Sequence, residues 1–442
     1  MKSAFLTCIA ALAAVFPAAG QQAGVDPVFA EWRTKADPAI ENGLSYLQRI
    51  QKKDGSFEGS YGDSTGVPAL VGMAFLSKGH LPTEGPYTVA INHCIDFILD
   101  NQKQEGLFEK GNAGQGPMYA HNISTLFLSE VSGMVDPERQ KRISAALPKA
   151  LGIILRAQAV KKDEKNRGGW RYHPGSNDSD TSCSGWALMA LRSAKLNGAA
   201  IPDEAIRNAV EYLHRHQRDK DGSFGYTSYE DHAMTLTGMG LLCLELCGEH
   251  GSDRTKRAAD WVLRNFRELP GSQFEYYGNY YNAQGMFQIG GRHWQEYANW
   301  MYANYLPKQS ADGSWESREA GRTYGTAMMV LAFIVPWRQL PIYQRDETVD
   351  EEPGTGCVFC GLKPYAFCLT DLHMSNTLTI RLPEDLNRWL DEESKATGLP
   401  KGRIVKEQLE RLRTAKARQP FLDLAGRVDG APDLSSRKGF GK

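Results

Sequence analysis

The stretch Gln217–Phe224, which reads QRDKDGSF, decides the fold of this chain. Its Asp-Gly pair predicts a tight turn, and the aromatic residue at its end anchors that turn. Copies of the stretch lie at 51–57 (QKKDGSF), at 309–315 (QSADGSW) and, less closely, from Gln102 and from Gln158. A second marker travels with them, a small residue followed 13 residues later by glycine, as at Gly238 and Gly251. Two markers in fixed phase indicate an internal repeat of about 50 residues.

Each turn separates two kinds of helical segment. The segment before the turn mixes polar and apolar residues, whereas the segment after it is apolar nearly all round. A helix that is apolar all round is buried on both sides. An open solenoid would leave one face of such an inner layer in water, so we predict a closed α/α toroid of roughly six helix pairs. The fold class is mainly α, with no strand expected before residue 376.

The N-terminus has the three parts of a secretory signal peptide. Lys2 precedes an apolar run over residues 4–16, and the small residues of 17–20 follow. We therefore expect residues 1–20 to be removed and the mature chain to be secreted or periplasmic. No later apolar run reaches the ~20 residues that a membrane-spanning helix needs, so no spanning segment is expected after the signal peptide.

The repeats resemble those of the prenyltransferase and squalene oxidase family. The resemblance rests on Tyr212–Phe224 (Y-L-x3-Q-x3-D-G-S-F), on Tyr305–Trp315 and on the GGWRYHP stretch at 168–174. Over about residues 38–345 the chain is similar to the C-terminal half of squalene–hopene cyclases, within the terpenoid-cyclase toroids, and we assign residues 21–345 to this domain. The resemblance implies the fold; because toroids host unrelated activities, it does not fix the function.

Squalene–hopene cyclases carry a D-x-D-D-T segment whose central aspartate protonates an alkene. The nearest match here is 177–181 (NDSDT), in which only Asp180 and Thr181 fall on the motif and Asp178 is displaced by one position. A strong acid needs coupled carboxylates or a desolvating site. Cyclase-type catalysis would thus need Asp180 buried beside a second acid, Asp178 or Asp231. The alternative is that Asp178 or Asp180 caps the following helix.

The starts of the inner helices bring aromatic and polar residues to one end of the ring. We expect the following residues to line a cavity there: Tyr119, His121, Tyr229, His232, Tyr276, Tyr277, Tyr280 and Tyr324. Aromatic faces could hold an isoprenoid or a cation, or they fill the core. His232 lacks the Asp and Cys partners of the prenyltransferase zinc site, so no metal or cofactor is expected. Binding of an apolar or polymeric ligand ranks ahead of a divergent terpenoid cyclase or lyase that uses Asp180.

The chain changes character after about residue 345. Residues 346–373 read as a linker or fusion scar, and residues 374–442 hold 14 Lys/Arg against 10 Asp/Glu. Residues 376–382 alternate like a strand, and two amphipathic helices follow. Residues 374–417 resemble the ribbon-helix-helix repressors of antitoxins, and 418–442 resemble their disordered, toxin-binding tails.

That resemblance implies DNA, a second copy of the module and possibly a toxin as partners. Thr377, Thr379 and Arg381 would face the major groove, where a two-stranded ribbon fits. Lys401 and Arg403, at the start of the second helix, would contact phosphate. A secreted ring cannot deliver a DNA reader to cytoplasmic DNA. We therefore interpret the chain as two reading frames joined by fusion or by annotation error, the second of which needs the cytoplasm when expressed separately.

Overall fold

The structure, a computed structural model, describes residues 27–59, 64–110, 116–228, 232–337 and 340–343, with a few further positions between 389 and 408. The chain divides into two compact units, Met1–Thr377 and Leu378–Lys442. None of the helices in the described part is both long enough and apolar enough to cross a membrane. The predicted signal peptide and the predicted linker lie outside the described residues.

In the first unit the described residues form twelve α-helices and no strand. The odd-numbered helices make an outer layer: α1 (Pro27–Ile50), α3 (Thr88–Asp100), α5 (Pro137–Ala159), α7 (Asp203–His216), α9 (Asp253–Asn265) and α11 (Gly291–Tyr305). The even-numbered helices make an inner layer: α2 (Gly66–Ser77), α4 (Met118–Val131), α6 (Thr181–Leu196), α8 (Ala233–Leu246), α10 (Glu275–Ile289) and α12 (Gly321–Phe333).

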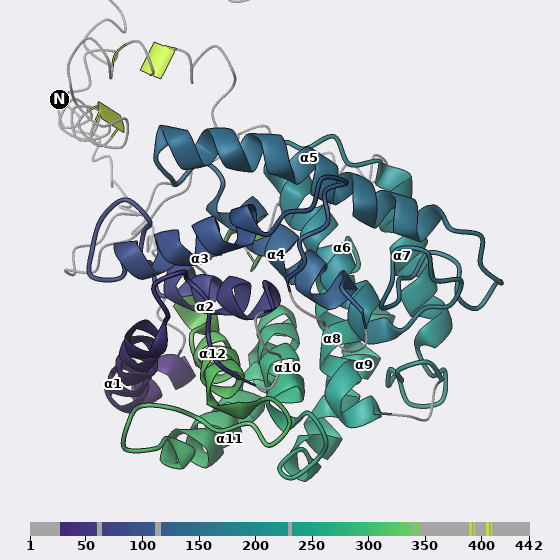
Figure 1. The fold of residues 1–442 in the computed structure, drawn as a ribbon. Helices are drawn as coiled ribbons and strands as arrows, with labels where there is room; N and C mark the ends of the chain where they lie inside the picture. The colour runs from purple at the N-terminus through teal and green to yellow at the C-terminus, as the bar shows by residue number, and fades with distance from the viewer. Residues whose placement is uncertain are drawn as a thin grey trace, which may run out of the picture. The chain divides into compact units, whose positions relative to one another are not determined.

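The inner helices form a closed ring. Each contacts the next inner helix along the chain, and α12 contacts α2 (Figure 1). The outer helices pack on the inner ones, and at the seam α1 packs against both α11 and α12. The mainly helical toroid predicted from the repeats is confirmed, with its first and last pairs in contact.

Burial explains why the two layers differ in sequence. Every residue of α2 is buried, because the helix touches other helices on all sides. Helix α9 buries only one stripe, Thr255, Ala258, Ala259 and Val262, and leaves its charged face to water. Apolar character all round thus marks the inner layer, and amphipathic character marks the outer layer.

The glutamine that opens each repeat turn ties neighbouring repeats together. Its side-chain amide donates to a carbonyl of its own turn and to a carbonyl in the next outer helix. The five pairs of acceptors are Gly55 and Ala90 for Gln51, Gly106 and Ala146 for Gln102, Gly168 and Ala205 for Gln158, Gly222 and Arg254 for Gln217, and Gly313 and Ala39 for Gln309. Since Ala39 lies in α1, the last copy closes the ring.

The rest of the motif fixes the turn to the inner helix that follows. Asp221 accepts both the N–H and the hydroxyl of Ser223, at 3.0 and 2.7 Å. The N–H of Phe224 then donates to the hydroxyl of Thr237 in α8 at 3.1 Å. The corresponding aromatic residues of two other repeats do the same: the N–H of Trp170 donates to the Ser184 hydroxyl of α6, and the N–H of Trp315 donates to the Thr326 hydroxyl of α12. The QxxxDGSF stretch is therefore a structural device of the fold.

The turn glycines predict a test of this packing. At Gly168, φ is +88° and an added Cβ would lie 2.1 Å from the Asn208 carbonyl oxygen; at Gly198, φ is +86° and no atom lies within 4 Å. Gly198→Ala is expected to cost about 1–2 kcal/mol from its left-handed backbone. Gly168→Ala is expected to cost a further ~1–3 kcal/mol, because packed backbone must move. Chemical denaturation of the two variants measures the difference, and equal losses would contradict the close approach.

One repeat lacks the glutamine turn. Between α9 and α10 the chain passes through a short 3-10 helix, Phe266–Glu268, and reaches α10 through Phe274. Phe274 has φ +59°, a left-handed conformation that is uncommon for an aromatic residue. Because this connection has no glutamine turn, the turn motif does not mark the pair formed by α9 and α10.

The second unit is described at only a few positions. Leu390 and Ile404 are buried, and Trp389 of the same helical turn as Leu390 is 44% exposed. The predicted strand and the DNA-contacting residues Thr377, Thr379, Arg381, Lys401 and Arg403 lie outside the described residues.

Candidate functional site

Arg171 and Asp180 come together because a short loop folds back before α6. The N–H of Asp180 donates to the Trp170 carbonyl at 2.9 Å, and the N–H of Trp170 donates to the Ser184 hydroxyl at 2.8 Å. The Trp170 indole is fully buried and donates to the Ile154 carbonyl of α5 at 2.7 Å. The loop is thus fixed against both layers at the end of the ring where the inner helices begin, which we name the N-terminal mouth.

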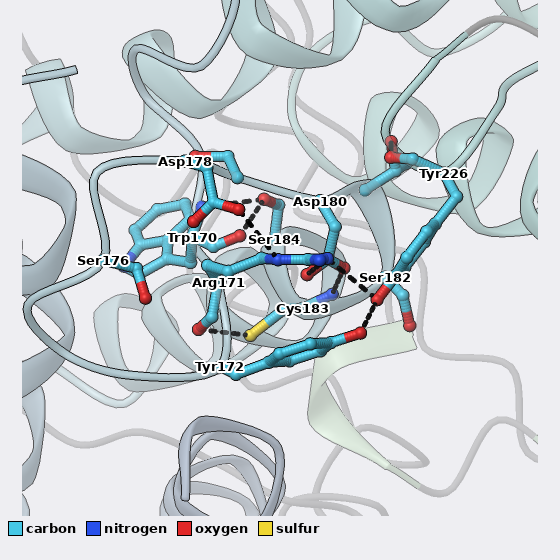
Figure 2. Close-up of polar contacts among 12 residues, drawn as sticks. Trp170, Arg171, Tyr172, Ser176, Asp178, Asp180, Ser182, Cys183, Ser184 and Tyr226 are labelled. Atoms are coloured by element: carbon cyan, nitrogen blue, oxygen red, sulfur yellow. Dashed lines mark hydrogen bonds and ion pairs between the residues drawn. The ribbon is translucent and has the colours of Figure 1, made fainter. Parts of the chain in front are cut away.

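Asp180 is the N-cap of α6, as one of the two interpretations of the sequence required. One carboxylate oxygen accepts the Cys183 N–H at 2.7 Å, and the other accepts from Arg171 Nη1 at 3.0 Å. Asp180 is completely buried, whereas the Asp178 side chain, 54% exposed, meets Arg171 Nε at 3.2 Å. Arg171 therefore bridges a buried and an exposed carboxylate (Figure 2).

Two tyrosine rings flank the same guanidinium. Its carbon lies 4.1 Å from the centre of the Tyr172 ring and 5.3 Å from that of Tyr226. Arg171 Nη1 donates to the Tyr226 hydroxyl at 3.0 Å, and the Tyr226 and Tyr172 hydroxyls share a short hydrogen bond (Figure 2). Both tyrosines are half-buried. Together with Arg171, Asp178 and Asp180 they form what we name the Arg171 cluster.

Burial sets the protonation states in the cluster. It raises the pKa of the Asp180 carboxyl to about 6, against the Cys183 N–H and the charge of Arg171, which both lower it. Burial, and then the charge of Asp180, also raise the pKa of Tyr226 and of the neighbouring Tyr119. Near neutral pH the cluster therefore presents an ionised carboxylate and neutral phenols that can donate hydrogen bonds.

The raised pKa of Asp180 predicts a pH dependence of stability. Its folded pKa lies above the ordinary value of 3.8, so its contribution is fully present below about pH 4 and is lost as the pH rises through 6. Relative to an Asp180→Asn variant, the native chain should lose roughly 3 kcal/mol of unfolding free energy over that window. Urea titrations of both proteins at several pH values measure this; a constant difference between them would contradict the assignment.

Lys162 supports the loop from below. Its ammonium donates to the Gly169 carbonyl at 2.5 Å and to the Ser179 hydroxyl at 3.3 Å. Burial lowers the pKa of Lys162 to about 8, and the nearby Cys183, Asp178 and Asp180 oppose that shift. Because its hydrogens are used within the loop, we assign Lys162 a positioning role.

Beneath the cluster, side chains of α6 and α10 meet inside the ring. The Ser182 and Tyr277 hydroxyls share a hydrogen bond at 2.6 Å. The Trp186 indole stacks at 6.1 Å on Tyr280 and meets Tyr281 edge-on at 5.5 Å. Helix α8 lies between α6 and α10 in the ring, so these contacts cross its interior. The aromatic residues here pack on one another, as one of the two sequence interpretations required.

Comparisons with known proteins support the fold. Neither a family model nor a curated protein matches the chain. Among solved structures, an inactive variant of the α-1,6-mannanase GH76A of Salegentibacter, in complex with α-1,6-mannotriose, is 11% identical with a TM-score of 0.50, covering 68% of this chain and 98% of its own. The type II terpene cyclase MstE from Scytonema is 14% identical with a TM-score of 0.46, covering 68% and 97%. The mannanase likeness shows a shared fold alone.

His121 lies between the two layers rather than inside the ring. Its Nδ1 accepts the Phe108 N–H at 3.0 Å, so its Nε2 carries the proton that is donated to the Ala150 carbonyl of α5 at 3.1 Å. Burial lowers its pKa to about 4. His121 fills the position that Ser184 and Thr237 fill in other repeats, which explains its presence without a ligand.

The other predicted residues are spread around the N-terminal mouth. His232 is exposed, has φ +55° and meets the Tyr226 ring edge-on at 5.8 Å. Tyr119 lies with its ring 5.8 Å from that of Tyr172. Tyr276 is buried at the start of α10 and Tyr324 is half-buried in α12. Tyr229 and Asp231 lie outside the described residues.

The sequence pointed to Asp180 and missed its partners. Arg171 and Tyr172 belong to the GGWRYHP stretch at 168–174, which was interpreted as a mark of the fold and not of a site. No sequence signal pointed to Tyr226, because it reaches the cluster only through the packing of α6 against α8. Within the described residues no three His, Cys, Asp or Glu side chains gather closely enough to hold a metal ion.

Proposed function

We propose that the toroid binds a hydroxyl-rich polymer, a glycan chain, at the Arg171 cluster. One observation carries this proposal: a guanidinium held between two half-buried tyrosine rings and two carboxylates at the N-terminal mouth. Aromatic faces pack against the apolar faces of sugar rings, while a few fixed polar groups orient the hydroxyls. A secreted chain, as the N-terminus predicts, would meet such polymers outside the cell.

The geometry favours binding over acid catalysis. Both oxygens of Asp180 face N–H donors, one on Cys183 and one on Arg171. These donors favour the ionised form, and although burial raises the pKa to about 6, the carboxylate is ionised near neutral pH and holds Arg171 in place. The alternative function, a terpenoid cyclase or lyase that uses Asp180, needs a proton donor that this arrangement opposes.

The filled interior favours a polymer over an isoprenoid. An isoprenoid chain needs an apolar cavity large enough to surround it. Between α6 and α10 that space is taken by Trp186, Tyr280 and Tyr281, all at most 1% exposed. A polymer end can instead lie across the N-terminal mouth. The mannanase of the same fold holds a mannotriose, so the fold is compatible with a saccharide site.

Calorimetric titration of the full chain with neutral oligosaccharides and with a polyprenyl alcohol tests the proposal. We expect saccharide binding that Tyr226→Ala and Arg171→Lys each weaken at least about tenfold, since one lost stacking or bidentate contact is worth that much. Trp261→Phe, on the outer helix α9, is the control and should bind normally. Binding of the polyprenyl alcohol alone, or saccharide binding indifferent to both variants, would overturn it. Turnover abolished by Asp180→Asn would favour the enzyme.

For the second unit we propose the DNA-binding role that its sequence resembles. Buried Leu390 and Ile404 fit two packed amphipathic helices, and the 44% exposed Trp389 is an apolar surface that a second copy would cover. Full chain and an Arg381→Ala variant should be compared on DNA fragments by fluorescence anisotropy. We expect affinity that falls steeply with added salt and base discrimination that drops by ~1–3 kcal/mol in the variant. Salt-independent binding, or none, would exclude this role.

A further inference from the structure

The chain returns across the ring after its last helix. Helix α12 is followed by a 3-10 turn, Val335–Trp337, that contacts α10 and α12. A second 3-10 turn, Pro341–Tyr343, contacts α6. All the inner helices begin at the N-terminal mouth, so their last residues mark the opposite end, which we name the C-terminal mouth.

Three inner helices hold residues 340–343 at that mouth. The N–H of Ile342 donates to the Glu130 carboxylate of α4 at 3.1 Å, and the same carboxylate accepts a short hydrogen bond from Ser193 of α6. Gln288, near the end of α10, donates to the Tyr343 carbonyl at 3.2 Å. In the ring, α4 and α10 are separated by other inner helices on both sides, so the segment spans its opening.

The segment also enters the interior. The Tyr343 hydroxyl forms a short hydrogen bond with the Tyr280 hydroxyl in the middle of α10. Leu340, Ile342 and Tyr343 are 3%, 1% and 6% exposed. Glu130 is 1% exposed, and a buried carboxylate requires hydrogen-bond donors. The Ile342 N–H supplies one of them, which explains an acid near the end of a helix that contains no other Asp, Glu, Lys or Arg.

We propose that residues 340–343 are a displaceable plug that closes the C-terminal mouth of the ring. Within these described residues, hydrogen bonds to Glu130, Gln288 and Tyr280 hold the plug to the ring. Short segments held by a few hydrogen bonds open at far lower free energy than packed helices do. When the plug leaves, a second entrance to the interior opens, lined by Tyr280, Gln288 and Glu130. This proposal is independent of the saccharide site at the N-terminal mouth.

The chain carries its own reporter of this opening. Cys243 of α8 is 1% exposed and lies within the inner layer, where its sulfur is 3.9 Å from the Gly185 carbonyl oxygen of α6. Cys94 of α3 is equally buried but lies in the wall between layers, where Gln51 donates to its sulfur at 3.2 Å. Both are free thiols. Labelling of Cys243 reports the interior, and labelling of Cys94 reports general unfolding.

The experiment is iodoacetamide labelling of the full chain, with each cysteine followed by peptide mass spectrometry. In the native protein both thiols should react slowly, because burial raises the pKa of each. In an Ile342→Gly/Tyr343→Gly variant we expect Cys243 to react at least about tenfold faster while Cys94 stays unchanged. Glu130→Gln, which removes the charge but keeps an acceptor, should give a smaller increase of the same kind. Val89→Gly, an exposed site on α3, is the matched surface control.

Two results would overturn the plug. If Cys243 in the double variant reacts as slowly as in the native protein, residues 340–343 do not close the entrance. If Cys243 and Cys94 both react faster by the same factor, the segment is part of the common core and its loss unfolds the ring. Circular dichroism of the double variant at the labelling temperature identifies the second case directly.

Discussion

Arg171→Ala is expected to lower the free energy of unfolding by about 3–5 kcal/mol at neutral pH, as breaking one side of a buried pair does. Asp180 is completely buried, and without the guanidinium it loses its charged donor and keeps backbone N–H donors such as that of Cys183. The Tyr226 and Tyr172 rings would lose the cation between them as well. Urea denaturation followed by tryptophan fluorescence measures the loss.

Two comparisons separate this effect from a general loss of charge. Arg318→Ala removes an arginine whose side chain is 71% exposed and pairs with Glu319, and it should cost less than about 1 kcal/mol. Adding Asp180→Asn to Arg171→Ala removes the orphaned charge and should restore part of the stability. The loss should also shrink at pH 5, where an unpaired Asp180 takes up a proton. A loss no larger than that of Arg318→Ala would show that the pair contributes little.

Trp315→Ala is expected to cost about 3–5 kcal/mol, the range for truncating a buried aromatic side chain. Trp315 is fully buried at the seam, and its indole N–H donates to the Tyr305 carbonyl at 2.8 Å. Its ring fits against Gly43 of α1, where an added Cβ would lie 3.0 Å away. The variant therefore opens a cavity where the last repeat meets the first, and calorimetric unfolding should show it.

The repeats supply the control for this prediction. Phe57, Phe108 and Phe224 occupy the same motif position in other copies and are all buried. Trp315→Phe should keep most of the packing and lose the hydrogen bond to Tyr305, at a cost of about 0.5–1.5 kcal/mol besides the smaller volume. If Trp315→Ala cost no more than Trp315→Phe, the seam would not depend on this side chain.

The ring was predictable because its signals are local and repeated. Gln217, Asp221 and Phe224 make contacts within their own turn and with the next helix, so their spacing along the chain carries the geometry. The repeat before α10 shows the limit, since its Phe274 turn has no motif that a period search could find. The inner helices were recognisable in the sequence because they are apolar nearly all round. A helix with neighbours on every side has no face left for solvent-exposed polar residues.

The candidate site was only partly predictable. Asp180 stood out through a family motif, and its capping role followed from its place before an apolar helix. Arg171 and Tyr226 meet only because two repeats lie side by side, a contact that no spacing in the sequence encodes. His121 was misleading, because histidine is a residue type that suggests a functional site. Its position in the repeat instead places it between the inner and outer layers, where it holds the turn at Phe108. The DNA-contacting residues around Arg381 stay predictions.

The bond from Gln309 to the Ala39 carbonyl has a consequence for how the ring comes apart. In a linear stack the terminal units have one neighbour each and fray first, so melting spreads inward from the ends. Here the last unit is fastened to the first, and every unit has two neighbours. No unit can loosen without breaking two interfaces, so the whole ring should melt in one sharp transition. By the same logic, a circularly permuted chain cut at Gly198, whose surroundings are open, should rebuild the ring.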